Sequence, residues 1–333
     1  MQRILVIRGG AIGDLILTLP VLRALRSVFP NACIDVMGDA KRANLACHPA
    51  HADAVTDAEQ QEIYRLFSHE PRVPRQLAAY LSEFDLILSY LPTSHAPFVD
   101  NLKRWCRGEV IAWPPHPSGV THVTDHLMEP VLRYARHGLP SEPRVFPTTA
   151  QRQAAGQFWR AAGLPKQGVL AMHPGSGGWH KLWPLEGWRQ VAAWAAQKGV
   201  PGLLIGGPAE EERGITQSLN ALAPAWKVVR NAPLPELAAV LARCEVLAGH
   251  DSGITHLAAA VGTRTLALFG PTDPRAWGPR SQQCCVIQPA SPGPLSLDNM
   301  PAEAVIRTLR ALLNGTFQFS PSEVGHTRLQ VPA

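Results

Sequence analysis

The sequence predicts an α/β protein with parallel sheets. Short apolar runs typical of buried strands alternate with longer segments of helical spacing, and glycine-rich or proline-rich turns separate them. Of the 333 residues, 46% are apolar, which is enough for sizeable cores. At roughly 150 residues per domain, we expect two domains, 1–147 and 148–315, and a tail of low order at 316–333. Three prolines between 140 and 147 mark the linker.

The first domain is expected to begin with a strand at 3–7, a glycine-rich turn and a helix with apolar residues at helical spacing. Gly13 would let Asp14 project from the head of this helix at the carboxyl edge of the sheet. A carboxylate in a first helical turn also stabilises the helix dipole without any further function, so both interpretations remain open. The spacing G-G-x-x-G differs from the G-x-G-x-x-G of dinucleotide-binding turns, which makes NAD binding the weaker alternative.

Further strands of this domain are expected at 32–37, 53–56 and 86–91, and a helix at 121–137. Between them lie basic side chains, among them Arg72 and Lys103. Such residues usually form a solvated face, but beside a cleft they would receive an anionic acceptor. The sequence does not choose between these interpretations.

A glycine loop follows the first strand of the second domain, 168–172. Small residues at 175–178 allow close backbone approach to a ligand, and Lys181 supplies a movable positive charge suited to phosphate. The Walker A pattern does not fit this loop. A plain glycine turn is the alternative.

Two more turns follow strands of the second domain. After the strand 199–205, Glu210, Glu211 and Glu212 open a helix. Acidic residues in a first helical turn normally complement the dipole, but one of these three lies where a ribose diol would need a carboxylate acceptor. After the run ending at Gly249, Asp251 and Ser252 are cap residues of a helix at 254–261. Free N–H groups at such a helix start attract an anion.

Composition restricts the function further. The net charge of +5 and the pI near 9.0 fit anionic substrates or a membrane surface, but no long Lys/Arg run suggests nucleic-acid binding. The six cysteines form no CxxC pair and are expected to be reduced and structural, and no metal site or cofactor is expected. Without a signal-peptide pattern or 18 consecutive apolar residues, we expect a cytoplasmic protein.

Several motifs together resemble glycosyltransferase family 9, which includes the ADP-heptose:lipopolysaccharide heptosyltransferases. The resemblance spans about residues 1–312. The motifs occur in the family's order: Gly13-Asp14 with Leu-Thr-Leu-Pro (17–20), His-Pro-Gly-Ser…Lys-x-Trp-Pro (173–184), Gly-Gly-Pro-Ala-Glu (206–210), Asp-Ser-Gly-Ile-Thr-His-Leu (251–257) and Gly-Pro-Thr-Asp-Pro (270–274).

This resemblance implies the GT-B architecture, in which two Rossmann-like domains face each other, the N-terminal one binding the acceptor and the C-terminal one the nucleotide-sugar. It also implies inverting, metal-independent transfer. Residue by residue, it makes Asp14 the general base, Lys181 the phosphate-binding lysine, Glu210 the ribose-binding carboxylate and Asp251 the contact to the donor sugar. The expected substrate-binding set is Gly13, Ser176, Gly177, Lys181, Glu210, Asp251, Ser252, Gly253 and His256, with Asp14 and Lys181 catalytic. Gly177 departs from the family pattern, which has a hydroxyl residue there.

The expected reaction is transfer of heptose from ADP-heptose to an anionic lipopolysaccharide core acceptor, by a protein that can contact the inner membrane face. A related transferase with another nucleotide-sugar or acceptor is the first alternative. A non-catalytic nucleotide-sugar binding protein is the second, and an NAD-dependent oxidoreductase the third.

Overall fold

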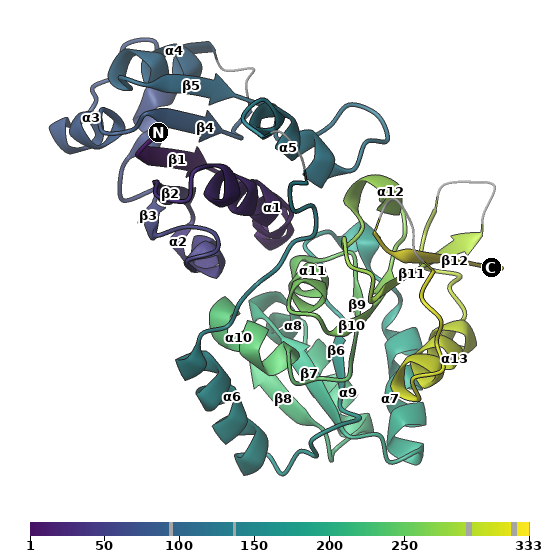
Figure 1. Ribbon diagram of the computed structural model, residues 1–333. Coiled ribbons are helices and arrows are strands. Elements are labelled where there is room, and N and C mark those ends of the chain that lie inside the picture. The colour runs from purple at the N-terminus through teal and green to yellow at the C-terminus, as the bar shows by residue number, and fades with distance from the viewer. Residues whose placement is uncertain (93–95, 136–137, 291–294, 321–324, 333) are drawn as a thin grey trace. The chain divides into compact units, whose positions relative to one another are not determined.

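A computed structural model describes residues 1–92, 96–135, 138–290, 295–320 and 325–332. The chain forms two compact units, Met1–Pro143 and Arg144–Ala333 (Figure 1). The boundary between them lies within the proline-rich segment 140–147.

The N-terminal unit is built on a five-stranded parallel sheet in the order β3-β2-β1-β4-β5. Its strands are β1 (Arg3–Ile7), β2 (Cys33–Gly38), β3 (Ala54–Asp57), β4 (Leu86–Ser89) and β5 (Glu109–Ala112). The central strand β1 pairs Ile4 with Ile34 on one side and Leu86 on the other. It is a continuous apolar run because both faces of the sheet are covered by helices.

Helices α1 and α5 pack against each other, and α4 packs against α3 and η2. The helices are α1 (Ile12–Val28), α2 (Ala40–Ala43), α3 (Arg75–Leu81), α4 (Ala96–Trp105) and α5 (Val123–Leu132), with short 3₁₀ turns η1 (Asn44–Ala46) and η2 (Ile63–Phe67). The helix expected at 121–137 is α5, which ends earlier, at Leu132. Residues 136 and 137 lie outside the described residues.

The C-terminal unit contains a seven-stranded parallel sheet in the order β12-β11-β10-β9-β6-β7-β8. Its strands are β6 (Leu170–His173), β7 (Gly202–Gly206), β8 (Lys227–Arg230), β9 (Val246–His250), β10 (Arg264–Leu268), β11 (Cys284–Ala290) and β12 (Thr327–Pro332). Its helices are α6 (Thr149–Ala161), η3 (Trp179–Lys181), α7 (Leu185–Gln197), α8 (Pro208–Glu212), α9 (Ile215–Leu222), α10 (Leu234–Leu241), α11 (Gly253–Ala260), α12 (Pro274–Trp277) and α13 (Ala302–Leu313). A large core joins α7, α9 and α13 to one face of the sheet.

The expectation of a low-order tail at 316–333 is wrong for residues 327–332, which form the edge strand β12. This strand pairs in parallel with β11, from Cys285 opposite Thr327 onward. Leu329 and Val331 pack on the core, whereas Arg328 is exposed. The alternation extends over only six residues and ends at a proline, which makes it too short to stand out in the sequence. Residues 321–324 and 333 lie outside the described residues.

Both sheets place the residues singled out from the sequence beyond the carboxyl ends of their strands. Asp14 follows β1, the glycine loop follows β6, Glu210 follows β7 and Asp251 follows β9. This edge is where open α/β sheets bind ligands. Among the described residues, no helix is long and apolar enough to cross a membrane.

Candidate active site

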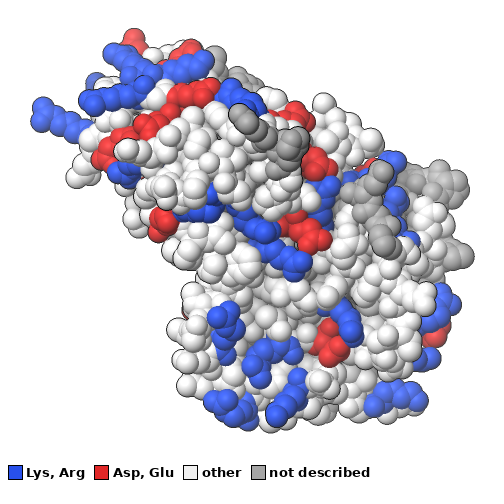
Figure 2. Space-filling view, in the orientation of Figure 1, with Lys and Arg blue, Asp and Glu red and all other residues white. Residues whose placement is uncertain are grey.

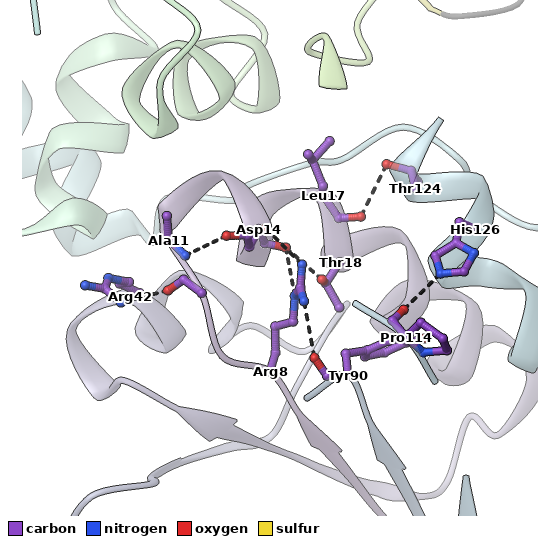
Figure 3. A network of polar contacts seen from close by, with 11 residues as sticks. Arg8, Ala11, Asp14, Leu17, Thr18, Arg42, Tyr90, Pro114, Thr124 and His126 are labelled. Carbon is purple, nitrogen blue, oxygen red and sulfur yellow. Dashed lines mark hydrogen bonds and ion pairs between the residues drawn. The ribbon is translucent and has the colours of Figure 1, made fainter. Parts of the chain in front are cut away.

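In the N-terminal unit, the candidate site residue is Asp14, in the first turn of α1 (Figure 3). Its Oδ1 lies 3.1 Å from Nη2 of Arg8, and its Oδ2 accepts a hydrogen bond of 2.6 Å from the backbone N–H of Ala11. The side chain is 19% exposed. Asp14 therefore stabilises the start of the helix and also keeps part of a carboxylate accessible at the sheet edge.

Arg8 is the partner that the sequence analysis missed. Its side chain is only 2% exposed, and its guanidinium also donates to the backbone oxygens of Asp14 and Tyr90, at 3.3 and 3.4 Å. Burial lowers the pKa of Arg8 from its usual value, an effect opposed by the charge of Asp14. An arginine stays protonated even so. Arg8 directly follows the apolar strand β1. A charged residue in that position was the sequence feature that could have indicated a role at the sheet edge.

Gly10 is the glycine that shapes this turn. Its φ is +97°, and a Cβ added there would lie 2.5 Å from Oδ2 of Asp14. Gly13, which was expected to let Asp14 project from the head of the helix, lies within the first turn of α1. The conformational freedom is needed at Gly10, before the helix begins.

Basic side chains of the N-terminal unit do not form a single patch on the face of the molecule drawn in Figure 2. Figure 2 shows lysine and arginine interspersed with acidic residues there. Arg72, Arg75, Lys103, Arg104 and Arg107 are all exposed.

In the C-terminal unit, Lys181 and Asp251 form one ion pair, although they are 70 residues apart in sequence. Lys181 Nζ lies 2.6 Å from Asp251 Oδ2, and the two side chains are 28% and 7% exposed. The hydroxyl of Ser176 donates to the backbone oxygen of Asp251 at 2.9 Å. The glycine loop is thus tied to the end of β9 by a charge pair and a hydrogen bond.

Glu210 lies beneath the glycine loop and is 6% exposed. Its Oε2 accepts from the backbone N–H of Gly207 at 2.8 Å, so it caps α8 as the simpler interpretation requires. A Cβ at Gly175 would lie 1.9 Å from Glu210 Oε1. Gly175 therefore allows the loop backbone to rest on this carboxylate. Gly177 faces open space, and no such constraint holds there.

The first turn of α11 completes the cluster of candidate residues in the C-terminal unit. Ser252 is the N-cap, and its Oγ accepts from the backbone N–H of Thr255 at 3.4 Å. Gly253 is the first helical residue and presents its N–H at the helix start. His256 is 5% exposed and so belongs mainly to the packing beneath this turn.

Two buried histidines of the C-terminal unit, His173 and His250, were not among the predicted site residues. Burial lowers the pKa of His173, while the charge of Glu210 raises it. His250 ends β9 next to Asp251 and is fully buried. Its position directly before Asp251 was the local sequence feature that could have drawn attention to His250.

The loop Gly-Pro-Thr-Asp-Pro (270–274) follows β10, whose Leu268 lies opposite His250 of β9, so this loop leaves the same carboxyl edge of the sheet as Asp251. It borders a cavity of about 440 Å³, lined among others by Asp273, Arg275, Gln288 and Arg328. No group of three or more His, Cys, Asp or Glu side chains within the described part of the chain is arranged to hold a metal ion.

Comparisons with known proteins define the class of this site. The family profile described as Glycosyltransferase family 9 (heptosyltransferase) matches residues 118–294, which is 177 of 333 residues. Lipopolysaccharide heptosyltransferase 2 of Escherichia coli K12 is 25% identical over 324 residues, covering 86% of this chain and 88% of the relative. Lipopolysaccharide heptosyltransferase 1 of the same strain is 32% identical over 136 residues, 40% of each chain.

Solved structures show the same fold. The structure titled E. coli ADP-heptose lps heptosyltransferase II superimposes with a TM-score of 0.75 at 21% identity, over 95% of this chain and 99% of the other. A family 9 glycosyl transferase from Veillonella parvula gives the same score and identity over 94% and 97%. These matches confirm the GT-B fold class.

The protein is a glycosyltransferase. It belongs to glycosyltransferase family 9, as the sequence motifs indicated.

Proposed function

We propose that the protein transfers heptose from ADP-heptose to an anionic lipopolysaccharide core acceptor, with inversion and without a metal ion. The named activities of its relatives support the sugar and the acceptor. The observation that carries the proposal is the cluster of Lys181, Asp251 and Ser176 at the start of α11. This cluster combines a positive charge, hydrogen-bond donors and a carboxylate, which a nucleoside diphosphate sugar requires.

In this proposal, the C-terminal unit binds the donor. Lys181, the N–H of Gly253 and the Ser252 cap contact the diphosphate and stabilise the charge that develops as it leaves. Asp251 exchanges its ion pair with Lys181 for contacts to the hydroxyls of the sugar. Glu210 accepts from the ribose, and Gly177 and Ser176 line the loop. Lys181 and the N–H groups at the helix start would stabilise the charge of the departing diphosphate without a metal, a role that Mg²⁺ has in other transferases.

The N-terminal unit supplies the base and binds the acceptor. An acceptor oxygen attacks the anomeric carbon, the bond from that carbon to the diphosphate breaks, and ADP leaves with the electron pair. The proton of the acceptor hydroxyl passes to Asp14, whose side chain is held in place by its ion pair with Arg8. Gly13 directly precedes Asp14 in the sequence. A single displacement of this kind inverts the anomeric configuration. In this proposal the reaction takes place at the cytoplasmic face of the inner membrane, with peripheral contact between the protein and that membrane.

Calorimetric titration of the protein with ADP, GDP, UDP and NAD tests the donor assignment. Saturable heat with ADP alone supports it, and loss of that heat in Lys181→Ala assigns the site. Preference for UDP or GDP would indicate a related transferase with another donor. Binding of ADP-heptose without any turnover on acceptor would indicate a non-catalytic binding protein, and binding of NAD alone would indicate an oxidoreductase.

A further inference from the structure

His250 connects both ends of the segment 175–183, which contains the glycine loop, to the end of β9, which Asp251 follows. It is the last residue of β9 and is fully buried. Its Nε2 lies 2.8 Å from the backbone nitrogen of Trp183 and 3.2 Å from Nε1 of Trp188. Its Nδ1 lies 3.3 Å from the backbone oxygen of Gly175. One imidazole therefore contacts the loop where it begins and where it ends.

These partners determine the tautomer of His250. Both groups at Nε2 are N–H donors, so Nε2 must offer its lone pair. Nδ1 then carries the hydrogen and donates it to the carbonyl of Gly175. Burial is the main cause that lowers the pKa of His250 to about 3, opposed by the hydrogen bond to Gly175 and aided by nearby His173, so the ring is neutral at physiological pH. A protonated ring would lose the acceptor that both tryptophan N–H groups use.

The loop between these contacts bears the donor-binding groups. Ser176 follows Gly175 directly, and Lys181 precedes Trp183 by two residues. The next residue after His250 is Asp251, whose Oδ2 lies 2.6 Å from Lys181 Nζ. Any displacement of the loop relative to β9 therefore changes the distance between the lysine and the carboxylate.

We propose that His250 is a positioning residue that fixes both ends of the 175–183 loop and thereby sets Lys181 and Ser176 for the donor diphosphate. The effect on donor binding rests on the proposed function, whereas the effect on the loop does not. His250 touches no substrate in this proposal and acts through the loop.

Two substitutions separate its contacts. His250→Asn keeps an amide donor near the position of Nδ1 and removes the acceptor used by Trp183 and Trp188. His250→Gln extends a carbonyl oxygen toward the position of Nε2 and restores that acceptor. Thr263→Ala is the matched control, because Thr263 is 4% exposed in the same unit and its hydroxyl donates to the Leu241 carbonyl at 2.7 Å. It removes a buried hydrogen bond far along the chain from the loop.

The first readout is amide hydrogen exchange of the ligand-free protein. In His250→Asn we expect the amide of Trp183 and those of the preceding loop residues to exchange at least about tenfold faster, because one lost hydrogen bond corresponds to roughly that factor. His250→Gln should recover part of the protection. Thr263→Ala should leave these amides unchanged. Unchanged loop exchange in folded His250→Asn, or an equal change in the control, would overturn the inference.

The second readout is affinity for ADP by calorimetry, with kcat and KM for the donor where turnover is measurable. His250→Asn should raise the Kd of ADP and the donor KM about tenfold, with kcat at saturating donor nearly unchanged. A purely structural role would lower stability and leave the affinity of the folded protein unaltered. If the wild-type protein fails to bind ADP while the loop still loosens in the variant, the donor assignment fails and the positioning role stands.

Discussion

The ion pair between Lys181 and Asp251 gives the sharpest prediction about donor binding. A charge-assisted contact contributes about 1.5–3 kcal/mol, so Lys181→Ala should weaken ADP binding by roughly 10- to 150-fold. In the free protein, however, Lys181 is already 2.6 Å from a carboxylate that is 7% exposed. ADP carries no sugar for Asp251 to contact, so this carboxylate competes with the diphosphate for the lysine.

Asp251→Asn should therefore bind ADP more tightly than the wild type, while turnover with the complete donor falls because the sugar contact is lost. The double variant should bind ADP no better than Lys181→Ala, since the gain depends on the freed lysine. Lys198→Ala removes an exposed positive charge from the same unit and serves as the control. Calorimetry with ADP measures all four variants. Unchanged affinity in Lys181→Ala, or weaker ADP binding in Asp251→Asn, would refute the assignment of this pair.

Four further predictions concern the base, the loop, the metal and the pH. Asp14→Asn should retain ADP affinity but lose turnover by about 10²–10⁴-fold; calorimetry and an ADP-release assay check this, and full activity would remove Asp14 from the mechanism. Gly175→Ala should weaken ADP binding, because its Cβ would lie 1.9 Å from Glu210 Oε1, whereas Gly177→Ala meets open space; equal Kd values would contradict the packing. Transfer should survive EDTA, and loss restored by Mg²⁺ or Mn²⁺ would show metal dependence. The pKa of His250 is about 3 in the folded protein and about 6.5 in the unfolded chain. Because the unfolded chain takes up a proton between these values, the free energy of unfolding should fall as the pH is lowered from 6.5 toward 3, by up to about 1.4 kcal/mol per pH unit. Denaturant unfolding should show a smaller pH dependence in His250→Gln, and an identical dependence would argue against a neutral buried ring.

The fold could be predicted largely because each buried strand is an apolar run followed by a turn. β1 and β9 are examples: the apolar run Ile4–Ile7 is followed by Arg8, and the run from Val246 to Gly249 is followed by His250. β12 could not be predicted, because which of its side chains are buried depends on its pairing with β11. Its stability comes from tertiary pairing that no local window contains.

The candidate site likewise contains residues that the sequence indicated and residues that only the fold reveals. Lys181 and Asp251 stood out individually because charged residues followed strands, but their pairing depends on adjacent strands β6 and β9. Arg8 and His250 were missed because their importance lies in buried contacts to backbone groups distant in sequence. Residue type at a strand end predicts where chemistry occurs, and the fold determines which groups support it.

A transfer assay with defined donors tests the central claim most directly. Purified protein is incubated in EDTA with a truncated lipopolysaccharide core acceptor and either ADP-heptose, a UDP-sugar or a GDP-sugar, and the saccharide product is analysed by mass spectrometry and by proton NMR at the anomeric position. The account predicts one added heptose from ADP-heptose alone, with the anomeric configuration opposite to that of the donor. Transfer from a UDP- or GDP-sugar instead, or a product that retains the donor configuration, would contradict it.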